Sequence, residues 1–279
     1  MKKLLSIMLA MILVFTFTAC SKDGANNTPD GEEEVKELKV GLECNYAPFN
    51  WTQSKETEDS VPIPSGGFAG GYDVQIAKKI AEGLGRKLVI VKTEWDGLTP
   101  AVNSGKIDAI IAGMSPTAER ALEIDFTDAY YESDLVVVVN KDSGYASAKS
   151  LEDFKGAKIT GQLNTFHYSV IDQIPSVRKQ TALENFPAMI VALESGKIDG
   201  YVSERPGAVS AVASNPDLTF VSFEEGKGFE ASPEDVSIAV GLKKGSELKE
   251  QINEILKGIS KEERQALMDE ALANQPLQQ

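Results

Sequence analysis

The sequence predicts an α/β protein built as two similar lobes with mostly parallel strands, and three observations predict it. The pentapeptide SGKID occurs twice, at 104–108 and 195–199, each time after an apolar stretch with helical spacing and before a short apolar strand. Strands and amphipathic helices alternate along most of the chain, which is typical of α/β layers. The composition, 42% hydrophobic and 25% charged, is that of a globular protein with a substantial core.

The first half of the chain shows this alternation in its local patterns. Apolar residues at alternate positions predict strands, apolar residues every three or four positions predict helices, and glycine marks a helix end. In order, we expect a strand at 37–42, a helix at 72–85, a strand at 87–94, a helix at 96–105 and a strand at 107–113. A long polar loop is expected at 52–71, and Ser115-Pro116 reads as the N-cap and first residue of a further helix.

The same pattern restarts in the second half. In order, we expect a strand at 157–161, helices at 165–174 and 184–196, strands at 198–204 and 236–242, and helices at 246–258 and 260–273. We expect residues 37–137 and 230–279 to form the first lobe and residues 138–229 the second, with crossovers near 135–142 and 228–236. A ligand site in such an architecture lies beyond the carboxyl ends of parallel strands, in the cleft between the lobes.

The N-terminal residues predict export. A basic start, MKK, precedes an apolar run and the small residues Thr18-Ala19, which describes a secretory signal peptide over 1–19. Cys20 stands where a bacterial lipoprotein carries its acylated, palmitate-bearing cysteine, and residues 20–36 read as a flexible tether. We therefore expect a lipid-anchored protein at the outer face of the cell membrane, on the periplasmic side in a Gram-negative host. An ordinary signal peptide with an incidental Cys20 is the alternative.

Charge and motifs argue against several functions. The formal net charge of −14 argues against a nucleic-acid partner, because phosphates demand a basic face. The only histidine, His167, is expected at the cleft rim, and the chain lacks metal-site spacing, a nucleophile elbow, a P-loop and a dinucleotide fingerprint. We therefore expect no metal, no cofactor and no catalytic residue. With Cys20 acylated, Cys44 is the only remaining thiol, which excludes an intramolecular disulfide and favours a half-buried structural role over a reactive one.

Five stretches, in their order and spacing, resemble family 3 of the bacterial extracellular solute-binding proteins, the polar amino acid receptors of ABC importers. They are VGLECNYAPFNW, GGYDVQIAKKIAEGLG, EWDGLTPAVNSGKIDAIIAGMSPTAER, IDFTDAYYES and LESGKIDGYVSE. The resemblance spans residues 40–270 and implies a type II periplasmic-binding-protein-like fold, a free amino acid as ligand, ABC permease subunits as partners and a monomer. A dehydratase on the same fold and a sensory module are the alternatives, since fold alone does not define function.

Arg120 is the first residue of the expected site. An arginine in the first turn of a helix opposes the helix dipole, unless the helix N-terminus and the guanidinium together receive a carboxylate. The residues alone leave a salt bridge to a nearby acid equally open, with Glu119, Glu123 and Asp125 as candidates. The resemblance implies that Arg120 binds the ligand α-carboxylate. Neighbouring residues of the same motif are expected in the site: Gly113, Met114 and Ser115.

The second lobe is expected to hold the ligand from the other side. Glu204 ends the strand after the second SGKID, where the family carries an acid, usually aspartate, that receives the ligand ammonium. Pairing with Arg205 is the alternative. The turn GQLNTFH supplies the remaining residues expected from this lobe, Gln162, Thr165 and Phe166. Asn164 replaces a glycine common in the family, which leaves the shape of this turn open.

Three residues of the first lobe are expected to recognise the ligand side chain. Tyr46 and Trp95 match the two aromatics that sandwich it in the family, with ordinary core packing as the alternative for each. Glu43 matches a position that often carries an acid facing the tip of the ligand. A carboxylate between aromatic faces suits a cation, so arginine, lysine or histidine is favoured as ligand. Glutamine stays open, because its amide can donate to the same acid, and so do other polar amino acids.

Overall fold

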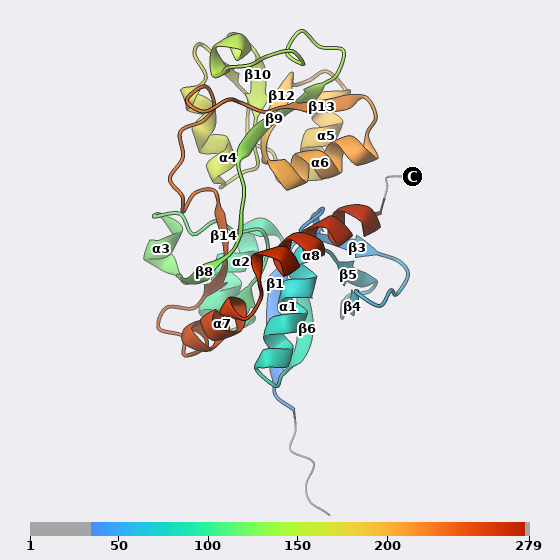
Figure 1. Cartoon of the computed structure of the whole chain (residues 1–279), viewed down its shortest axis with the longest axis vertical. Coiled ribbons are helices and arrows are strands. Elements are labelled where there is room, and N and C mark those ends of the chain that lie inside the picture. The colour runs from blue at the N-terminus through green and yellow to red at the C-terminus, as the bar shows by residue number, and fades with distance from the viewer. Residues whose placement is uncertain (1–34, 277–279) are drawn as a thin grey trace, which may run out of the picture. The chain divides into compact units, whose positions relative to one another are not determined.

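The computed structural model describes residues 35–276, and two five-stranded sheets divide these residues into two lobes (Figure 1). The first sheet has the order β6 (Lys87–Lys92), β1 (Glu37–Leu42), β7 (Ala109–Ile110), β14 (Ser237–Leu242) and β8 (Asp125–Glu132). The second has the order β11 (Arg178–Lys179), β10 (Lys158–Thr160), β12 (Gly200–Glu204), β9 (Leu135–Asn140) and β13 (Leu218–Val221). In each sheet the first three strands are parallel and the fourth is antiparallel to both neighbours, so the two lobes share one topology.

Helices accompany both sheets (Figure 1). The first lobe carries α1 (Tyr72–Gly83), α2 (Trp95–Ser104), α3 (Arg120–Glu123), α7 (Leu248–Lys257) and α8 (Lys261–Asn274). The second carries α4 (Phe166–Ser169), α5 (Phe186–Glu194), α6 (Arg205–Ser214) and the short 3₁₀ helices Leu151–Phe154 and Val170–Gln173. The expected helices and strands are thus largely confirmed, with ends shifted by a few residues. Among residues 35–276, no helix has both the length and the apolar character needed to cross a membrane.

Each SGKID copy closes a helix and opens a strand through the same contacts. Gly105 and Gly196 follow their helices with φ of 76° and 70°, the left-handed conformation that glycine adopts without strain. The carboxylates of Asp108 and Asp199 each accept a backbone N–H of the adjacent parallel strand, both at 2.8 Å. The repeated pentapeptide is therefore a structural joint, in which glycine ends the helix and aspartate sets the register of the strand.

The segment 52–71 is not the long loop that its composition predicts. It contributes to a small four-stranded sheet with the order β2 (Asn45–Tyr46), β3 (Asn50–Gln53), β5 (Phe68–Gly70) and β4 (Val61–Pro62). The side chains of Gln75 and Lys78 on α1 donate to the backbone carbonyls of Asp59 and Glu58, at 3.1 and 3.0 Å. Pairing with β3 and these contacts hold the segment against α1.

The chain first passes between the lobes a few residues earlier than expected. The run from Leu135 to Asn140, expected within the crossover 135–142, is instead strand β9 and pairs with β12 and β13 of the second sheet. The valines of β9 pair with two strands of the second sheet, so only Ser133 and Asp134 connect the lobes at this point. The expected boundary between the lobes at residue 137 therefore lies a few residues too late. The Ser133 N–H donates to the Val236 carbonyl at 3.0 Å, so the outgoing and returning segments lie side by side. The predicted signal peptide 1–19, Cys20 and most of the tether 20–36 lie outside the described residues.

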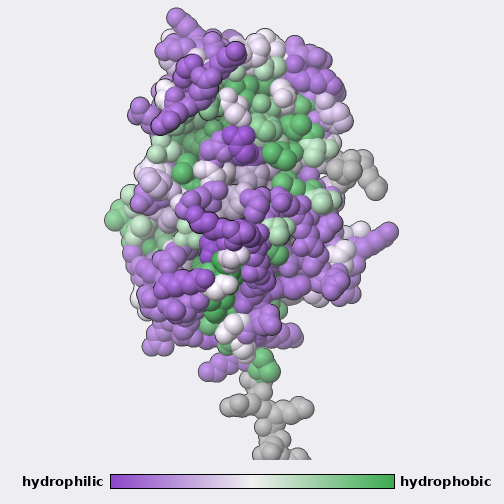
Figure 2. Space-filling view, in the orientation of Figure 1, coloured by the Kyte–Doolittle hydropathy of each residue, from purple (hydrophilic) through white to green (hydrophobic). Residues whose placement is uncertain are grey.

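Apolar packing differs between the lobes. The larger buried cluster fills the first lobe and continues into the second through Tyr46 and Phe186, whose rings stack with centroids 4.1 Å apart. A smaller cluster around Phe154 belongs to the second lobe alone. On the face drawn in Figure 2, hydrophilic residues cover most of the first lobe and hydrophobic residues gather on the second.

Two glycines of nearly equal backbone conformation give a matched test of close packing at the start of α1. Gly71 and Gly66 have φ of 116° and 115°, but a Cβ on Gly71 would lie 2.4 Å from the Phe49 carbonyl oxygen, whereas a Cβ on Gly66 would meet nothing within 4 Å. We expect Gly66→Ala to lower the free energy of unfolding by about 1–3 kcal/mol through strain alone, and Gly71→Ala by ~1–3 kcal/mol more through overlap. Urea unfolding measures both, and equal losses would contradict this account.

Candidate ligand-binding site

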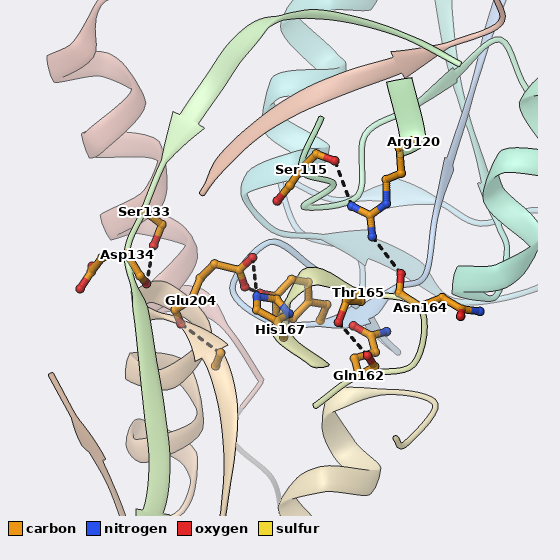
Figure 3. A network of polar contacts seen from close by, with 11 residues as sticks. Ser115, Arg120, Ser133, Asp134, Gln162, Asn164, Thr165, His167 and Glu204 are labelled. Atoms are coloured by element: carbon orange, nitrogen blue, oxygen red, sulfur yellow. Dashed lines mark hydrogen bonds and ion pairs between the residues drawn. The ribbon is translucent and has the colours of Figure 1, made fainter. Parts of the chain in front are cut away.

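The residues expected to bind a ligand converge between the lobes, near the carboxyl ends of β1, β7, β10 and β12. Figure 3 draws Ser115 and Arg120 of the first lobe close to Gln162, Thr165 and Glu204 of the second. Most of the expected residues line a small cavity of about 10 Å³, here called the inner cavity. Its lining residues are Tyr46, Trp95, Gly113, Ser115, Arg120, Gln162, Thr165, Phe166, His167 and Glu204. A wider space of about 770 Å³, here called the outer cleft, opens beside it and is lined by Met114 as well. Glu43 lies behind Gln162 and is the one expected residue that lines neither space.

Arg120 reaches from the first lobe to the second. Its guanidinium donates to the backbone carbonyls of Ser115 at 2.9 Å and of Asn164 at 3.0 Å, and Figure 3 shows it pointing toward both. The guanidinium also lies 4.9 Å from the centre of the Trp95 ring, within the range of a cation–π contact. Burial lowers its pKa to about 10, so it remains charged at neutral pH.

The alternative salt bridge of Arg120 is not formed among the described residues. No ion pair joins Arg120 to any of the three candidate acids, Glu119, Glu123 and Asp125. Asp125 instead lies 3.1 Å from Lys244. The guanidinium of Arg120 is therefore held by neutral backbone carbonyls, and none of the carboxylates that the structure describes forms an ion pair with it.

The expected helix start at Ser115-Pro116 is wrong. The carbonyl of Met114 accepts the backbone N–H of Ala239 in β14 at 3.0 Å, which holds this segment against the first sheet. The helix α3 is a single turn, Arg120–Glu123, and the Thr117 hydroxyl accepts the Arg120 N–H at 3.3 Å. So short a turn carries little dipole, and the role of Arg120 depends on its own charge.

Glu204 is the most completely bonded acid of the site. It is 3% exposed, and one carboxylate oxygen lies 2.8 Å from Nε2 of His167 while the other accepts the hydroxyl of Tyr46. Burial alone would raise its pKa, but His167 and these hydrogen bonds hold the pKa below its usual value. The alternative pairing with Arg205 is wrong, because Arg205 Nε donates to Asp134 at 2.7 Å instead.

Glu43 has the opposite environment. It follows β1, is 1% exposed, and its side-chain partner among the described residues is the neutral amide of Gln162, at 3.2 and 3.4 Å from its two oxygens. Burial raises its pKa to about 7, because the hydrogen bond from Gln162 offsets only part of the lost hydration. Gln162 comes from the second lobe and also donates to the carbonyl of Glu184 at 3.1 Å. Within residues 35–276, Glu43 is thus a buried acid with no cation beside it.

The turn after β10 fastens the second lobe to the first. Asn164 has a left-handed φ of 55°, which asparagine tolerates better than most residues, so it can replace the expected glycine. Its amide donates to Asp96 at 2.8 Å, and its carbonyl also accepts Trp95 Nε1 at 3.3 Å. Thr165, the N-cap of α4, donates its hydroxyl to the Gln162 carbonyl at 2.7 Å, and Phe166 begins the helix.

A family model for the bacterial extracellular solute-binding proteins, family 3, matches residues 38–272. The chain belongs to this family. It is 33% identical to a probable histidine-binding protein of Campylobacter jejuni, over 82% of this chain and 85% of the relative. It is 30% identical to the arginine-binding extracellular protein ArtP of Bacillus subtilis, over 92% of each chain. An amino acid ABC transporter substrate-binding protein from Streptococcus pneumoniae bound to L-arginine superposes with a TM-score of 0.73 at 28% identity, covering 85% of this chain and 94% of that one. These neighbours establish the two-lobed periplasmic-binding-protein-like fold of this solute-binding protein.

Two residues of this solute-binding protein lie in environments that the sequence does not predict. The sequence places His167 at the cleft rim, but His167 is 7% exposed, lines the inner cavity and contacts Glu204. Its place in the same turn as Thr165 and Phe166 was the available signal. Asn164 was expected only as an unusual residue, yet its backbone carbonyl joins both Arg120 and Trp95 to the second lobe. Every residue type has a backbone carbonyl, so a contact of this kind cannot be predicted from the identity of the residue.

The unpaired Glu43 predicts a pH-dependent cost in the ligand-free protein. Its pKa is about 7 when folded and 4.5 in its ordinary state, so ionisation opposes folding increasingly as pH rises through this interval. We expect Glu43→Gln to raise the free energy of unfolding by about 1–3 kcal/mol at pH 8 and by much less at pH 5. Urea titrations at both pH values measure this. The control is Glu152→Gln, which removes an exposed charge, and an equal gain there would contradict the assignment.

Proposed function

We propose that this protein is the substrate-binding component of an ABC importer, that it captures a basic amino acid between its lobes, and that it delivers it to the membrane permease. The observation that carries the choice of ligand is the burial of Glu43 beside a neutral amide, without a cationic partner. A guanidinium, ammonium or imidazolium of a ligand would supply that partner. The names of the relatives, histidine-binding and arginine-binding, and the arginine-bound neighbour support the same class.

The main-chain groups of an amino acid find complementary charges in the inner cavity. Arg120 is charged and paired only with backbone carbonyls, so it can receive the α-carboxylate through two parallel hydrogen bonds. Glu204 lies in the same cavity and, although both oxygens are already bonded, a carboxylate has further lone pairs for an ammonium. Gly113, Ser115, Thr165 and Phe166 complete the wall between these two charges in our proposal.

The outer cleft favours cations over anions. Four carboxylates line it, Asp96, Glu119, Glu123 and Asp235, and Arg120 is the one cationic side chain among its lining residues. A rim of one sign attracts ligands of the other and raises their local concentration. Glutamine is the second candidate, because its side-chain amide could donate to Glu43 as Gln162 does. It would gain nothing from the negative rim.

Capture requires the lobes to move. The inner cavity of about 10 Å³ has room for no more than about one water molecule. An amino acid therefore enters with the lobes apart, and closure around it brings Arg120 and Glu204 onto the same molecule. The passages at Ser133–Asp134 and at Val236 are the hinge in this proposal, since they are the segments that join the two sheets.

We propose that the protein acts by binding alone, without catalysis, and as a monomer. Its signal peptide 1–19 would direct export, and a lipid on Cys20 with the tether 20–36 would keep the binding lobes near the permease at the outer face of the cell membrane. Mass spectrometry of the membrane fraction tests the lipid anchor. The processed protein should begin with a diacylated Cys20.

The ligand assignment predicts the outcome of a thermal-shift panel of the twenty amino acids on protein unfolded and refolded to remove carried-over ligand. We expect the largest shift with arginine, lysine or histidine. A shift with glutamine alone would support the amino acid receptor function but contradict the assignment of a basic ligand to Glu43. No shift with any amino acid would contradict the proposed function.

Arg120 provides the second test of the site. We expect Arg120→Ala to weaken binding at least about thirtyfold, because the ligand carboxylate would be left desolvated without its charged donor. The control is Arg178→Ala, which removes an exposed arginine whose Nε donates to the Gly156 carbonyl outside the cleft. Calorimetry measures both affinities. An affinity of Arg120→Ala within about threefold of that of the unmodified protein would overturn the assignment of this residue.

Glu43 predicts proton release on binding. A ligand cation beside Glu43 lowers its pKa from about 7, so arginine binding at pH 7, where this acid is about half protonated, should release up to about half a proton and should tighten as pH rises from 6 to 8. Citrulline, the neutral isostere of arginine, should release none. Calorimetry in buffers of different ionisation enthalpy measures the protons. Proton release that persists in Glu43→Gln would contradict the assignment of the released proton to Glu43.

A further inference from the structure

A buried carboxylate lies beneath the ligand site and has no role in it so far. Asp73, the second residue of α1, is 0% exposed, and no ion pair involves it among the described residues. Its two oxygens accept hydrogen bonds from Tyr130, at 2.7 Å, and from Asn50, at 2.8 Å. Both donors are themselves 0% exposed. Burying an acid that has only neutral donors as partners costs free energy of folding. The segments that its hydrogen bonds restrain indicate what the burial achieves.

Through Asn50, the carboxylate reaches the turn 43–46, which carries Glu43 and Tyr46. The Asn50 side chain donates to Asp73 with Nδ2 and accepts the Cys44 N–H with Oδ1, at 2.7 Å. Cys44 has a left-handed φ of 58°, a strained conformation for a residue with a side chain, so it persists only where its surroundings impose it. The hydrogen bond from Cys44 to Asn50 is one such restraint, and it acts on the residue next to Glu43.

Through Tyr130, the carboxylate reaches the turn 113–115. The Tyr130 hydroxyl donates to Asp73 and lies 3.4 Å from the Gly113 N–H, for which it is the acceptor. Gly113 has a φ of 63°, and a Cβ there would lie 2.9 Å from the Tyr46 ring. The two turns therefore touch each other at the wall of the inner cavity, and one carboxylate holds both from behind.

We propose that Asp73 is a positioning residue that sets the shape of both first-lobe turns facing the ligand. The proposal rests on the proposed function for its binding readout, but not for its structural one. Aspartate suits this position because it is acceptor-only when ionised and so meets two donors without conflict. Asparagine, of the same shape, would turn an N–H₂ group toward one of these donors and break that arm. Burial raises the pKa of Asp73 to about 6, and the donors limit this rise, so it is ionised at neutral pH.

The two arms predict different changes in ligand preference. Asn50→Ala releases the turn next to Glu43, so the affinity for arginine should fall about tenfold and the affinity for citrulline much less. Tyr130→Phe releases the turn 113–115, which faces the main-chain groups that the two ligands share. The affinities for arginine and for citrulline should therefore fall by the same factor. Calorimetry on the full-length chain measures the ratio of the arginine affinity to the citrulline affinity in each variant. A general loss of stability would not separate the two ligands in one variant and spare the ratio in the other.

Matched variants away from the site provide the controls. Asn253 is buried and accepts the Asp128 N–H at 2.8 Å, so Asn253→Ala removes a comparable hydrogen bond near α7. Tyr201→Phe removes the hydroxyl of another fully buried tyrosine, one without a hydrogen-bond partner among the described residues, and so controls for loss of a buried hydroxyl alone. We expect both controls to bind arginine and citrulline within about twofold of the unmodified protein. An Asn50→Ala variant that keeps the original ratio, or a control that changes it equally, would overturn the proposal.

Hydrogen exchange separates failure of this proposal from failure of the proposed function. We expect the Cys44 amide to exchange at least about tenfold faster in Asn50→Ala, the Gly113 amide in Tyr130→Phe, and one or both in Asp73→Asn. This measurement needs no ligand. If the unmodified protein bound no amino acid, the receptor function would fail while these rates still tested the positioning role. Unchanged rates at both amides in Asp73→Asn would sink the positioning role.

Discussion

The burial of three carboxyl groups at and beneath the meeting surfaces of the lobes is the constraint on which the site depends. Glu43, Asp73 and Glu204 are each at most 3% exposed, and each loses hydration that a protein must replace. Glu204 is compensated by His167 and Tyr46, and Asp73 by two neutral donors. In the described part of the chain, Glu43 has only the amide of Gln162 as a side-chain partner. This unequal compensation distinguishes Asp73 and Glu204, whose partners replace much of the lost hydration, from Glu43, which still lacks a cation.

The shared topology of the lobes explains how these groups come together. The strand registers align Val40 with Ala109 in the first sheet and Ile159 with Gly200 in the second. Counting forward from those pairs, Glu43 and Gln162 occupy equivalent positions, and so do Gly113 and Glu204. Equivalent strand ends of two similar sheets face each other across the cleft, so the site is built from corresponding places in each lobe. The SGKID joints fix these strand ends by the same aspartate contact in both copies.

Local patterns were enough to predict the strands, the helices and the two-lobed fold, because each SGKID unit carries its own helix stop and strand start. Most of the site residues that the resemblance implies line one cavity in the structure, with Met114 and Glu43 as the exceptions. What could not be predicted depends on contacts between distant segments. Ser115-Pro116 reads as a helix start, but pairing of the preceding Met114 with β14 overrides the local preference. The partnership of His167 with Glu204 depends on two segments that only the tertiary fold joins.

The difference between the equivalent residues Glu43 and Gln162 gives the proposed selectivity a physical basis. Two glutamates at this separation would repel each other and share a proton, which would leave the pair less responsive to a ligand cation. Two glutamines would satisfy each other and offer no charge. One acid and one amide form a hydrogen bond that only partly offsets burial, as the raised pKa of Glu43 shows. A cationic ligand can then add what the amide lacks, so in the proposed function the same buried charge that disfavours closure of the empty protein favours closure around a basic amino acid.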